Sequence, residues 1–170
     1  SQPELAALMV GKAVTFRVEK EKRTPGKEVL SVSHLGVNHR NGRRAVDDLS
    51  LRVREGEIYG IIGVDGNGQP ELVQAITALT KIESGSVEIL GKDVTRAEPK
   101  QVLDCGVSHI PEDRQHMGIA MKRTVTDNLL LYNYNNKELK KGFFLDWKKL
   151  GRFAEDMVKK YNVKVPDLQM

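Results

Sequence analysis

The residues best suited to chemistry stand at 63–70, in the sequence GVDGNGQP. Gly63 and Gly68 have the spacing of the phosphate-binding pattern G-x-x-x-x-G-K-[ST], and Gly66 adds a third glycine between them. In such a loop, successive backbone N–H groups and the N-terminus of the next helix point at one anion. Glycines let the backbone wrap closely around that anion. The stretch therefore predicts a loop built to hold polyphosphate.

Two positions of this loop depart from the pattern. Gln69 replaces the lysine, and a unit charge about 4 Å from a phosphate is worth about 4 kcal/mol at an effective dielectric of 20. Pro70 replaces the serine or threonine and has neither a hydroxyl for Mg²⁺ nor an N–H for phosphate. Asp65 and Glu71 add negative charge nearby. If about 3 kcal/mol is lost, nucleotide binds roughly 100-fold more weakly than at an intact loop.

A structural interpretation of the same residues stays open. Proline is common in the first turn of a helix, where its missing N–H would be unpaired anyway, so Pro70 needs no ligand to explain it. Glu71 in the first turn suits the helix dipole. The glycines would then mark only a tight turn from strand to helix. Spacing alone does not decide between this turn and a nucleotide site.

The flanking patterns predict the elements that hold the loop. An apolar run, EIYGII at 57–62, is typical of a buried strand, and 71–79 has apolar residues at helical spacing. Asn41-Gly42 is a hairpin-turn signal between two further strands. The other expected elements are helices near 3–10, 98–105 and 146–163, strands near 28–35, 46–54, 84–90 and 107–110, and a charged Pro-Gly linker near 19–27.

Length and composition limit the classes to which the protein can belong. At 170 residues, 39% hydrophobic and 29% charged, the chain fits one soluble globular domain. No apolar run approaches the ~20 residues that cross a bilayer, and no secretory signal is visible. The single cysteine, Cys105, excludes an internal disulfide and fits a reducing cytoplasm. The net charge of +4 gathers partly at 19–27 and 39–44, in a predicted linker and turn, so we expect no nucleic-acid partner.

Three separated stretches carry a family resemblance. The run AVDDLSLRVREGEIYGIIGVDGNGQPEL, at 45–72, resembles the nucleotide-binding domains of ABC transporters. Its Gly-Asn-Gly-Gln loop is similar to the second ATPase domain of tandem ATP-binding subunits that energise uptake of sugars or nucleosides. At 107–131, Pro111-Glu112 stands where most ABC domains have the Pro-Gln of the Q-loop. The stretch ELAALMVGK, at 4–12, resembles the helix that leads from the first ATPase domain into the second.

The resemblance implies an α/β fold, a P-loop NTPase core of the ABC type with an antiparallel β subdomain and the start of a helical subdomain. Residues 1–27 would form the interdomain helix and linker. Residues 28–132 would form the nucleotide-binding core, and 133–170 an incomplete helical subdomain. No Walker B run, LSGGQ-like signature or switch histidine follows. We therefore expect the chain to hold the first part of one ATPase domain and not to hydrolyse ATP by itself, although the parent protein would.

The resemblance also implies a ligand, ATP with Mg²⁺, bound weakly or not at all. Arg40 or His39 takes the place of the aromatic residue that stacks on adenine in many ABC domains. Glu112 would replace a neutral contact to Mg²⁺ and water with a carboxylate. The expected nucleotide-binding residues are Arg40, Gly63, Asp65, Gly66, Asn67, Gly68, Gln69, Pro70, Glu71 and Glu112.

The function implied is that of a degenerate ATP-binding domain in an importer, coupling ATP binding and hydrolysis to uptake of sugars or nucleosides. Its partners would be a companion ATPase domain of the same chain and transmembrane permease subunits, at the cytoplasmic face of the membrane. The alternative is a structural or regulatory module that uses the same fold without nucleotide.

Two apolar groups outside the loop also have alternative interpretations. Met117, Ile119 and Met121 either contact the permease or pack under their own loop. The helix at 146–163 has an apolar face, from Trp147 to Tyr161, that is typical of a helix buried in its own domain. Because its usual partner helix would lie later in the family's domain, we expect part of this face to be exposed, packed in a non-native way, or used in self-association.

Overall fold

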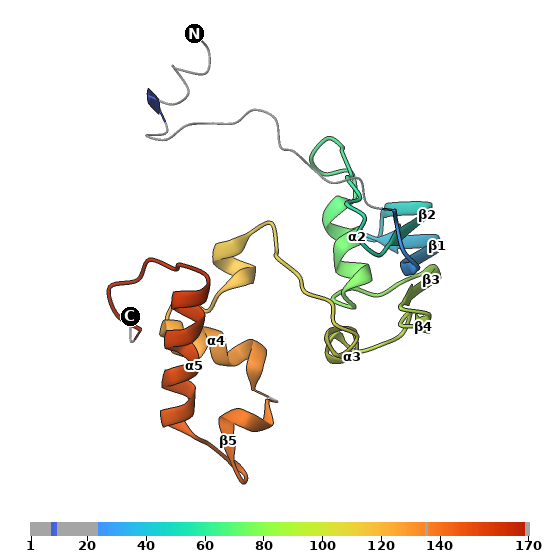
Figure 1. Ribbon diagram of the computed structural model, residues 1–170. Coiled ribbons are helices and arrows are strands. Elements are labelled where there is room, and N and C mark those ends of the chain that lie inside the picture. The colour runs from blue at the N-terminus through green and yellow to red at the C-terminus, as the bar shows by residue number, and fades with distance from the viewer. Residues whose placement is uncertain (1–7, 10–23, 135, 169–170) are drawn as a thin grey trace. The chain divides into compact units, whose positions relative to one another are not determined.

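A computed structural model describes residues 8–9, 24–134 and 136–168 (Figure 1). The chain divides into two compact units, 1–107 and 108–170, and each unit has its own core. Most of the helix expected at 3–10 and of the linker expected at 19–27 lies outside the described residues. Leu8 and Met9 are helical and exposed. The division at residues 27 and 132 stays a prediction.

The first unit is built on an antiparallel sheet with the strand order β2-β1-β3-β4. Its strands are β1 (Glu28–Asn38), β2 (Arg44–Arg54), β3 (Ser84–Ile89) and β4 (Lys92–Asp93). The strands predicted at 28–35, 46–54 and 84–90 are therefore confirmed. The turn predicted at Asn41-Gly42 joins β1 to β2: the His39 N–H donates to the Arg43 carbonyl at 2.8 Å, and Gly42 has a φ of +81°. That positive φ is one that glycine adopts without strain.

Two helices cover one face of this sheet, α2 (Gln69–Ile76) and α3 (Pro99–Asp104), at the helix positions that the sequence predicts. Val32 lies opposite Leu51 on one neighbouring strand and Val87 on the other, so β1 is the centre of the core. Burying each such side chain stabilises the fold by about 2 kcal/mol. The buried core residues are Val32, Leu35, Val37, Val46, Leu51, Leu72, Ala75, Val87, Ile89, Val94 and Val102.

Two strands predicted from the sequence are wrong. Residues 57–62 and 107–110 form no strand, and Ile58, Ile62 and Ile110 are at least 85% exposed. A strand is held by backbone hydrogen bonds to a neighbour. Among the described residues, neither segment has such a partner, because the sheet of the first unit contains only β1 to β4. Both apolar runs have the composition of a strand, but composition alone does not provide a neighbouring strand to which the backbone can hydrogen-bond.

The second unit holds two longer helices and a short hairpin. Its helices are α4 (Val125–Asn133) and α5 (Trp147–Lys160), its hairpin is β5 (Lys140–Lys141) with β6 (Phe144–Leu145), a π-helical turn spans Arg114–Gly118, and a 3-10 turn spans Lys137–Leu139. Leu139, Leu150 and Ala154 are buried and form the centre of this unit. The helix predicted at 146–163 is confirmed as α5.

The apolar face of α5 is only partly covered. Leu150 and Ala154 are fully buried, whereas Trp147 and Tyr161, at the two ends of the face, are each 67% exposed. The expectation that part of this face is exposed is therefore confirmed. Asp146 begins the helix, since its carboxylate accepts from the backbone N–H groups of Lys148 and Lys149 at 3.1 and 3.2 Å.

Asn128 organises the segment before α4. Its side-chain Oδ1 accepts from the Ala120 N–H at 2.7 Å, and its Nδ2 donates to the carbonyls of Ala120 and Thr124 at 3.2 and 3.0 Å. Thr124 is the N-cap, because its hydroxyl accepts from the Asp127 N–H at 3.0 Å. The loop at 120–124 is thus fixed to the helix that follows it.

Candidate functional site

Two hollows lie against α2 in the first unit. The first, of about 270 Å³, is bounded by the glycine loop at 63–70, the start of α2 and the strand β2. The second, of about 490 Å³, lies between the β1–β2 turn and α2. Both include residues that the sequence marks for nucleotide binding, so both are candidate parts of one site.

The glycine loop is attached to the sheet at Gly68. This residue is buried, has a φ of +89°, and begins α2 as its N-cap. A Cβ at this position would lie 2.1 Å from the Ala45 carbonyl oxygen, so only glycine lets the loop approach β2 so closely. No side chain caps the start of α2. Its first-turn N–H groups are therefore available to an anion, apart from the one that Pro70 lacks.

Gln69 folds back into the glycine loop. Its Nε2 donates to the Val64 carbonyl at 3.2 Å, and a Cβ at Gly63 would lie 2.0 Å from this same nitrogen. Its Oε1 is buried and has no hydrogen-bond partner in the described part of the chain. The carboxamide therefore lies over Gly63, inside the curve of the loop. Sequence reasoning recognises the lost lysine but not this contact, for which the sequence carries no signal.

The residues of the loop fit a phosphate group better than they fit Mg²⁺. The glycine backbone and the uncapped helix start supply N–H donors, which suit an anion. Pro70 supplies no hydroxyl, and Asp65 and Asn67 are exposed. The described residues contain no group of three His, Cys, Asp or Glu side chains that could hold a metal ion.

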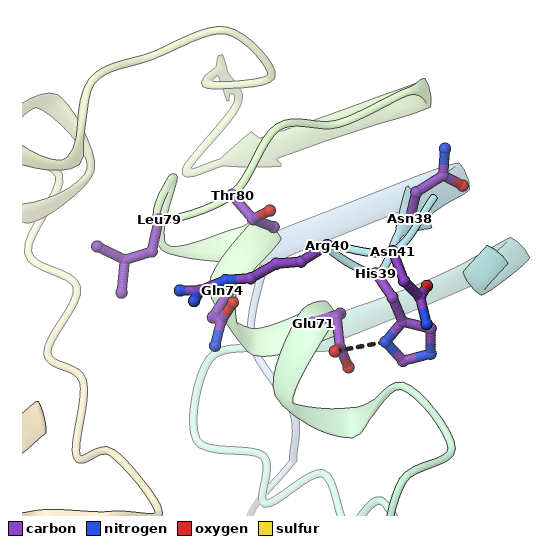
Figure 2. A pocket seen from close by; sticks show the side chains of 8 residues that line it. All are labelled: Asn38, His39, Arg40, Asn41, Glu71, Gln74, Leu79 and Thr80. Atoms are coloured by element: carbon purple, nitrogen blue, oxygen red, sulfur yellow. Dashed lines mark hydrogen bonds and ion pairs between the residues drawn. The ribbon is translucent and has the colours of Figure 1, made fainter. Parts of the chain in front are cut away.

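The second hollow, which we call the hairpin pocket, is polar. Figure 2 shows the His39 ring turned toward Glu71, and the His39 Nδ1 lies 2.8 Å from the Glu71 Oε1. Both side chains are largely buried, at 30% and 22% exposure. The contact joins the β1–β2 turn to the first turn of α2. The residues that line the hairpin pocket are Asn38, His39, Arg40, Asn41, Glu71, Gln74, Leu79 and Thr80.

This contact distinguishes His39 from Arg40, the two residues that the sequence offers for stacking on adenine. His39 is held by Glu71, so its ring is committed to that partner. Arg40 is exposed, and its side chain extends along the pocket in the direction of Gln74 (Figure 2). A free guanidinium can stack on a flat ring. The geometry therefore favours Arg40 over His39 for a nucleobase.

Glu112 belongs to the second unit, where its side chain is exposed. The next residue, Asp113, begins the π-helical turn by accepting from the N–H groups of Gln115 and His116 at 3.1 and 2.9 Å. The backbone hydrogen bond from His116 holds the pKa of Asp113 below its ordinary value, and the His116 side chain adds to this effect. Asp113 is thus a structural cap, and the role expected for Glu112 at the nucleotide stays a prediction.

The sequence also matches a family model. The model described as "ABC transporter" matches residues 46–165, which include the glycine loop, α2 and the whole of α5. This range covers more than half of the chain. The chain therefore belongs to the ABC transporter family, and the resemblance noted from the sequence is confirmed.

Curated relatives match the sequence of this chain over nearly its full length. The nucleoside import ATP-binding protein NupA of Lactococcus lactis is 42% identical over 95% of this chain and 32% of its own length. The guanosine import ATP-binding protein NupO of Bacillus subtilis is 40% identical over 98% of this chain and 33% of its own length. A ribose import ATP-binding protein of Rubrobacter xylanophilus is 33% identical over 98% of this chain and 32% of its own length. The chain thus spans about a third of the length of these relatives.

Solved structures show the same fold. The ATP-binding cassette MJ0796, described as a dimeric post-hydrolysis state bound to ADP and Pi, matches with a TM-score of 0.62 at 17% identity. The match covers 82% of this chain and 60% of that one. The CbiO1 protein of Clostridium perfringens matches with a TM-score of 0.57 at 17% identity over 84% of this chain and 53% of that one. The fold class, an α/β P-loop ATPase domain of the ABC type, is therefore confirmed.

Proposed function

We propose that this chain is the nucleotide-facing part of an importer ATPase domain whose own ATP site is degenerate. The observation that carries the proposal is the position of the Gln69 carboxamide, which lies over Gly63 and bonds to the Val64 carbonyl. A phosphate that entered the curve of the loop would have to displace this group. It would then meet backbone N–H donors but no lysine charge.

Two costs follow for the nucleotide. Displacing Gln69 breaks its hydrogen bond to Val64, which contributes roughly 1 kcal/mol. The absent lysine removes a further charge-assisted contact, about twice as strong as a neutral hydrogen bond. Together they support weak binding of ATP and still weaker binding of Mg²⁺, for which Pro70 offers no ligand.

The import function rests on relatives named for import of nucleosides, guanosine and ribose. By that analogy, the domain works with a companion ATPase domain of the same protein and with transmembrane permease subunits, at the cytoplasmic face of the membrane. None of the helices among the described residues is both long and apolar enough to span a bilayer. Met117, Ile119 and Met121 are at least half exposed, which favours a contact with the permease over packing under their own loop.

The second candidate function is a structural or regulatory module that binds no nucleotide. It is favoured by the Gln69 carboxamide, which occupies the space over Gly63, and by Pro70. Gly66 does not separate the two candidates, because its φ of +83° favours glycine with or without a ligand.

The test is a calorimetric titration of Mg-ATP into the 170-residue chain, beside the Gln69→Lys, Pro70→Ser double variant. We expect the variant to bind roughly 100-fold more tightly than the original chain. A chain that binds in the micromolar range without substitution would refute the weak site. A double variant that also fails to bind, although folded by circular dichroism, would favour the structural module.

A further inference from the structure

The β5–β6 hairpin of the second unit displays aromatic side chains at its tip. Lys140 pairs with Leu145, and Lys141 pairs with Phe144, so Gly142 and Phe143 form a two-residue turn. Gly142 has a φ of +64°, as the first position of a tight hairpin turn requires. The base of the hairpin is fixed, because the Asp146 N–H donates to the carbonyl of the buried Leu139 at 2.9 Å.

The aromatic tip, defined as Phe143, Phe144 and Trp147, is the most exposed aromatic group among the described residues. Phe143 and Phe144 are 103% and 81% exposed, and Trp147 is 67% exposed. Side chains of this size normally bury most of their surface, so three exposed ones within five positions of the chain point to an interaction site. Phe143 and Phe144 are left out of the core of their own unit, and Trp147 is the exposed end of the α5 face that Leu150 and Ala154 bury.

Lysines flank the aromatic tip on both sides. Lys140 and Lys141 precede it in β5, and Lys148 and Lys149 follow it in α5. None of the four lies in an ion pair with a described carboxylate. The sequence KKGFFLDWKK, at 140–149, carries four positive charges and one negative charge. The single acid, Asp146, is engaged as the helix cap.

Helix stability does not explain two of these lysines. Lys148 and Lys149 lie in the first turn of α5, where the helix dipole favours acids and disfavours cations. The lysines near the other end of the helix, Lys159 and Lys160, have the favourable position. The two first-turn lysines therefore oppose the dipole, and helix stability does not account for their position.

We propose that the aromatic tip and its four lysines form a contact surface for an anionic lipid bilayer. Aromatic side chains next to cations are the composition that settles at a membrane interface: the rings enter the boundary between headgroups and acyl chains. The long lysine side chains reach the lipid phosphates while their stems stay with the apolar layer. The opposite charges of lysines and headgroups select an anionic surface over a neutral one. This contact is independent of the glycine loop and does not depend on the proposed function.

The fluorescence emission of Trp147 can report this contact, because Trp147 is the only tryptophan in the sequence. The 170-residue chain is mixed with vesicles of equal parts phosphatidylglycerol and phosphatidylcholine, or with vesicles of phosphatidylcholine alone. We expect the Trp147 emission to shift to the blue only with the anionic vesicles, and to be quenched when the acyl chains carry bromine. Raising the salt concentration should reverse the shift, because salt screens the lysines.

Matched variants assign the binding to the tip. Phe143→Ser with Phe144→Ser should weaken vesicle binding at least tenfold, whereas Leu131→Ser with Tyr132→Ser, on the exposed face of α4, should leave it unchanged. Lys140→Gln with Lys141→Gln should weaken it about 30-fold, at about fivefold per lysine near an anionic surface. The control for charge is Lys159→Gln with Lys164→Gln. Circular dichroism checks that each variant is folded.

Three results would overturn the proposal. The first is the absence of a blue shift with anionic vesicles. The second is binding that the two phenylalanine substitutions do not change. The third is concentration-dependent self-association of the chain in the absence of lipid, detected by sedimentation, that buries Trp147 and is abolished by the phenylalanine substitutions. That last result would assign the tip to a second copy of the chain.

Discussion

The two hollows beside α2 differ in how their polar groups are used. In the hairpin pocket, His39 and Glu71 satisfy each other across 2.8 Å, and the exposed Arg40 is left for a ligand. In the glycine loop, Gln69 satisfies only one of its two polar atoms within the described protein, and its Oε1 is buried without a partner there. The hairpin pocket therefore leaves an exposed cation available, whereas the glycine loop holds a side chain that a ligand would have to displace.

Two glycines of the glycine loop, Gly63 and Gly68, also differ in what a Cβ at their position would contact. A Cβ at Gly68 would meet the backbone carbonyl of Ala45, which is fixed in β2. A Cβ at Gly63 would meet only the end of the Gln69 side chain, which can rotate away. One glycine is required by the fold, and the other is required only by Gln69.

The largest effect should come from the glycine that the fold requires. Gly68→Ala should destabilise the chain by about 3 kcal/mol, because alanine at a φ of +89° is strained and its Cβ clashes with a carbonyl oxygen. Gly63→Ala should cost less than about 1 kcal/mol, since only a side chain has to move. Urea unfolding followed by circular dichroism measures both. Equal losses at the two positions would remove the distinction between them.

A smaller effect, on ATP affinity, should follow from removing the Gln69 carboxamide from the glycine loop. Gln69→Ala removes the carboxamide from the space over Gly63 without restoring any charge. If displacement of this group costs roughly 1 kcal/mol, the variant should bind ATP about fivefold more tightly than the original chain. Calorimetry measures the affinity. Weaker binding by Gln69→Ala would mean that the carboxamide assists the nucleotide instead of competing with its phosphates.

The smallest effects should come from Arg40 and His39, the two residues of the β1–β2 turn, and should differ in kind. Arg40→Ala, made in the Gln69→Lys, Pro70→Ser background, should lower ATP affinity about twofold to fivefold, since an exposed cation stacked on a ring contributes about 0.5–1 kcal/mol. It should leave stability unchanged. His39→Ala should do the reverse, because it breaks the half-buried pair with Glu71. Thermal unfolding supplies the stability measurement. Loss of affinity from His39→Ala alone would assign the stacking to histidine.

The sequence predicts the first unit well where its contacts are local. The hairpin of β1 and β2 follows from the turn signal at Asn41-Gly42 between two predicted strands, and α2 follows from the apolar spacing of 71–79. The family assignment follows from motifs in the right order, and the family model confirms it. These features depend on residues that are close in sequence, so a pattern is sufficient to find them.

The features that the sequence does not predict depend on partners distant in the chain. The strands expected at 57–62 and 107–110 need backbone neighbours that the described residues do not provide. The His39–Glu71 contact joins residues 32 positions apart, and neither residue type indicates its partner. The inward fold of Gln69 is a choice of side-chain rotamer, which no spacing rule determines. The membership of the binding site, the glycine loop included, therefore stays a prediction.

The stretch from Glu57 to Asn67 has a consequence for digestion by proteases. It lies between β2 and α2, it is exposed, and its segment 58–64 forms no backbone–backbone hydrogen bond among the described residues. Such a segment is a preferred site for limited proteolysis. A single cut there would not separate the pieces, because β1, on one side of the cut, pairs with β3 on the other side. The nicked chain would run as two bands under denaturing conditions and as one particle under native conditions.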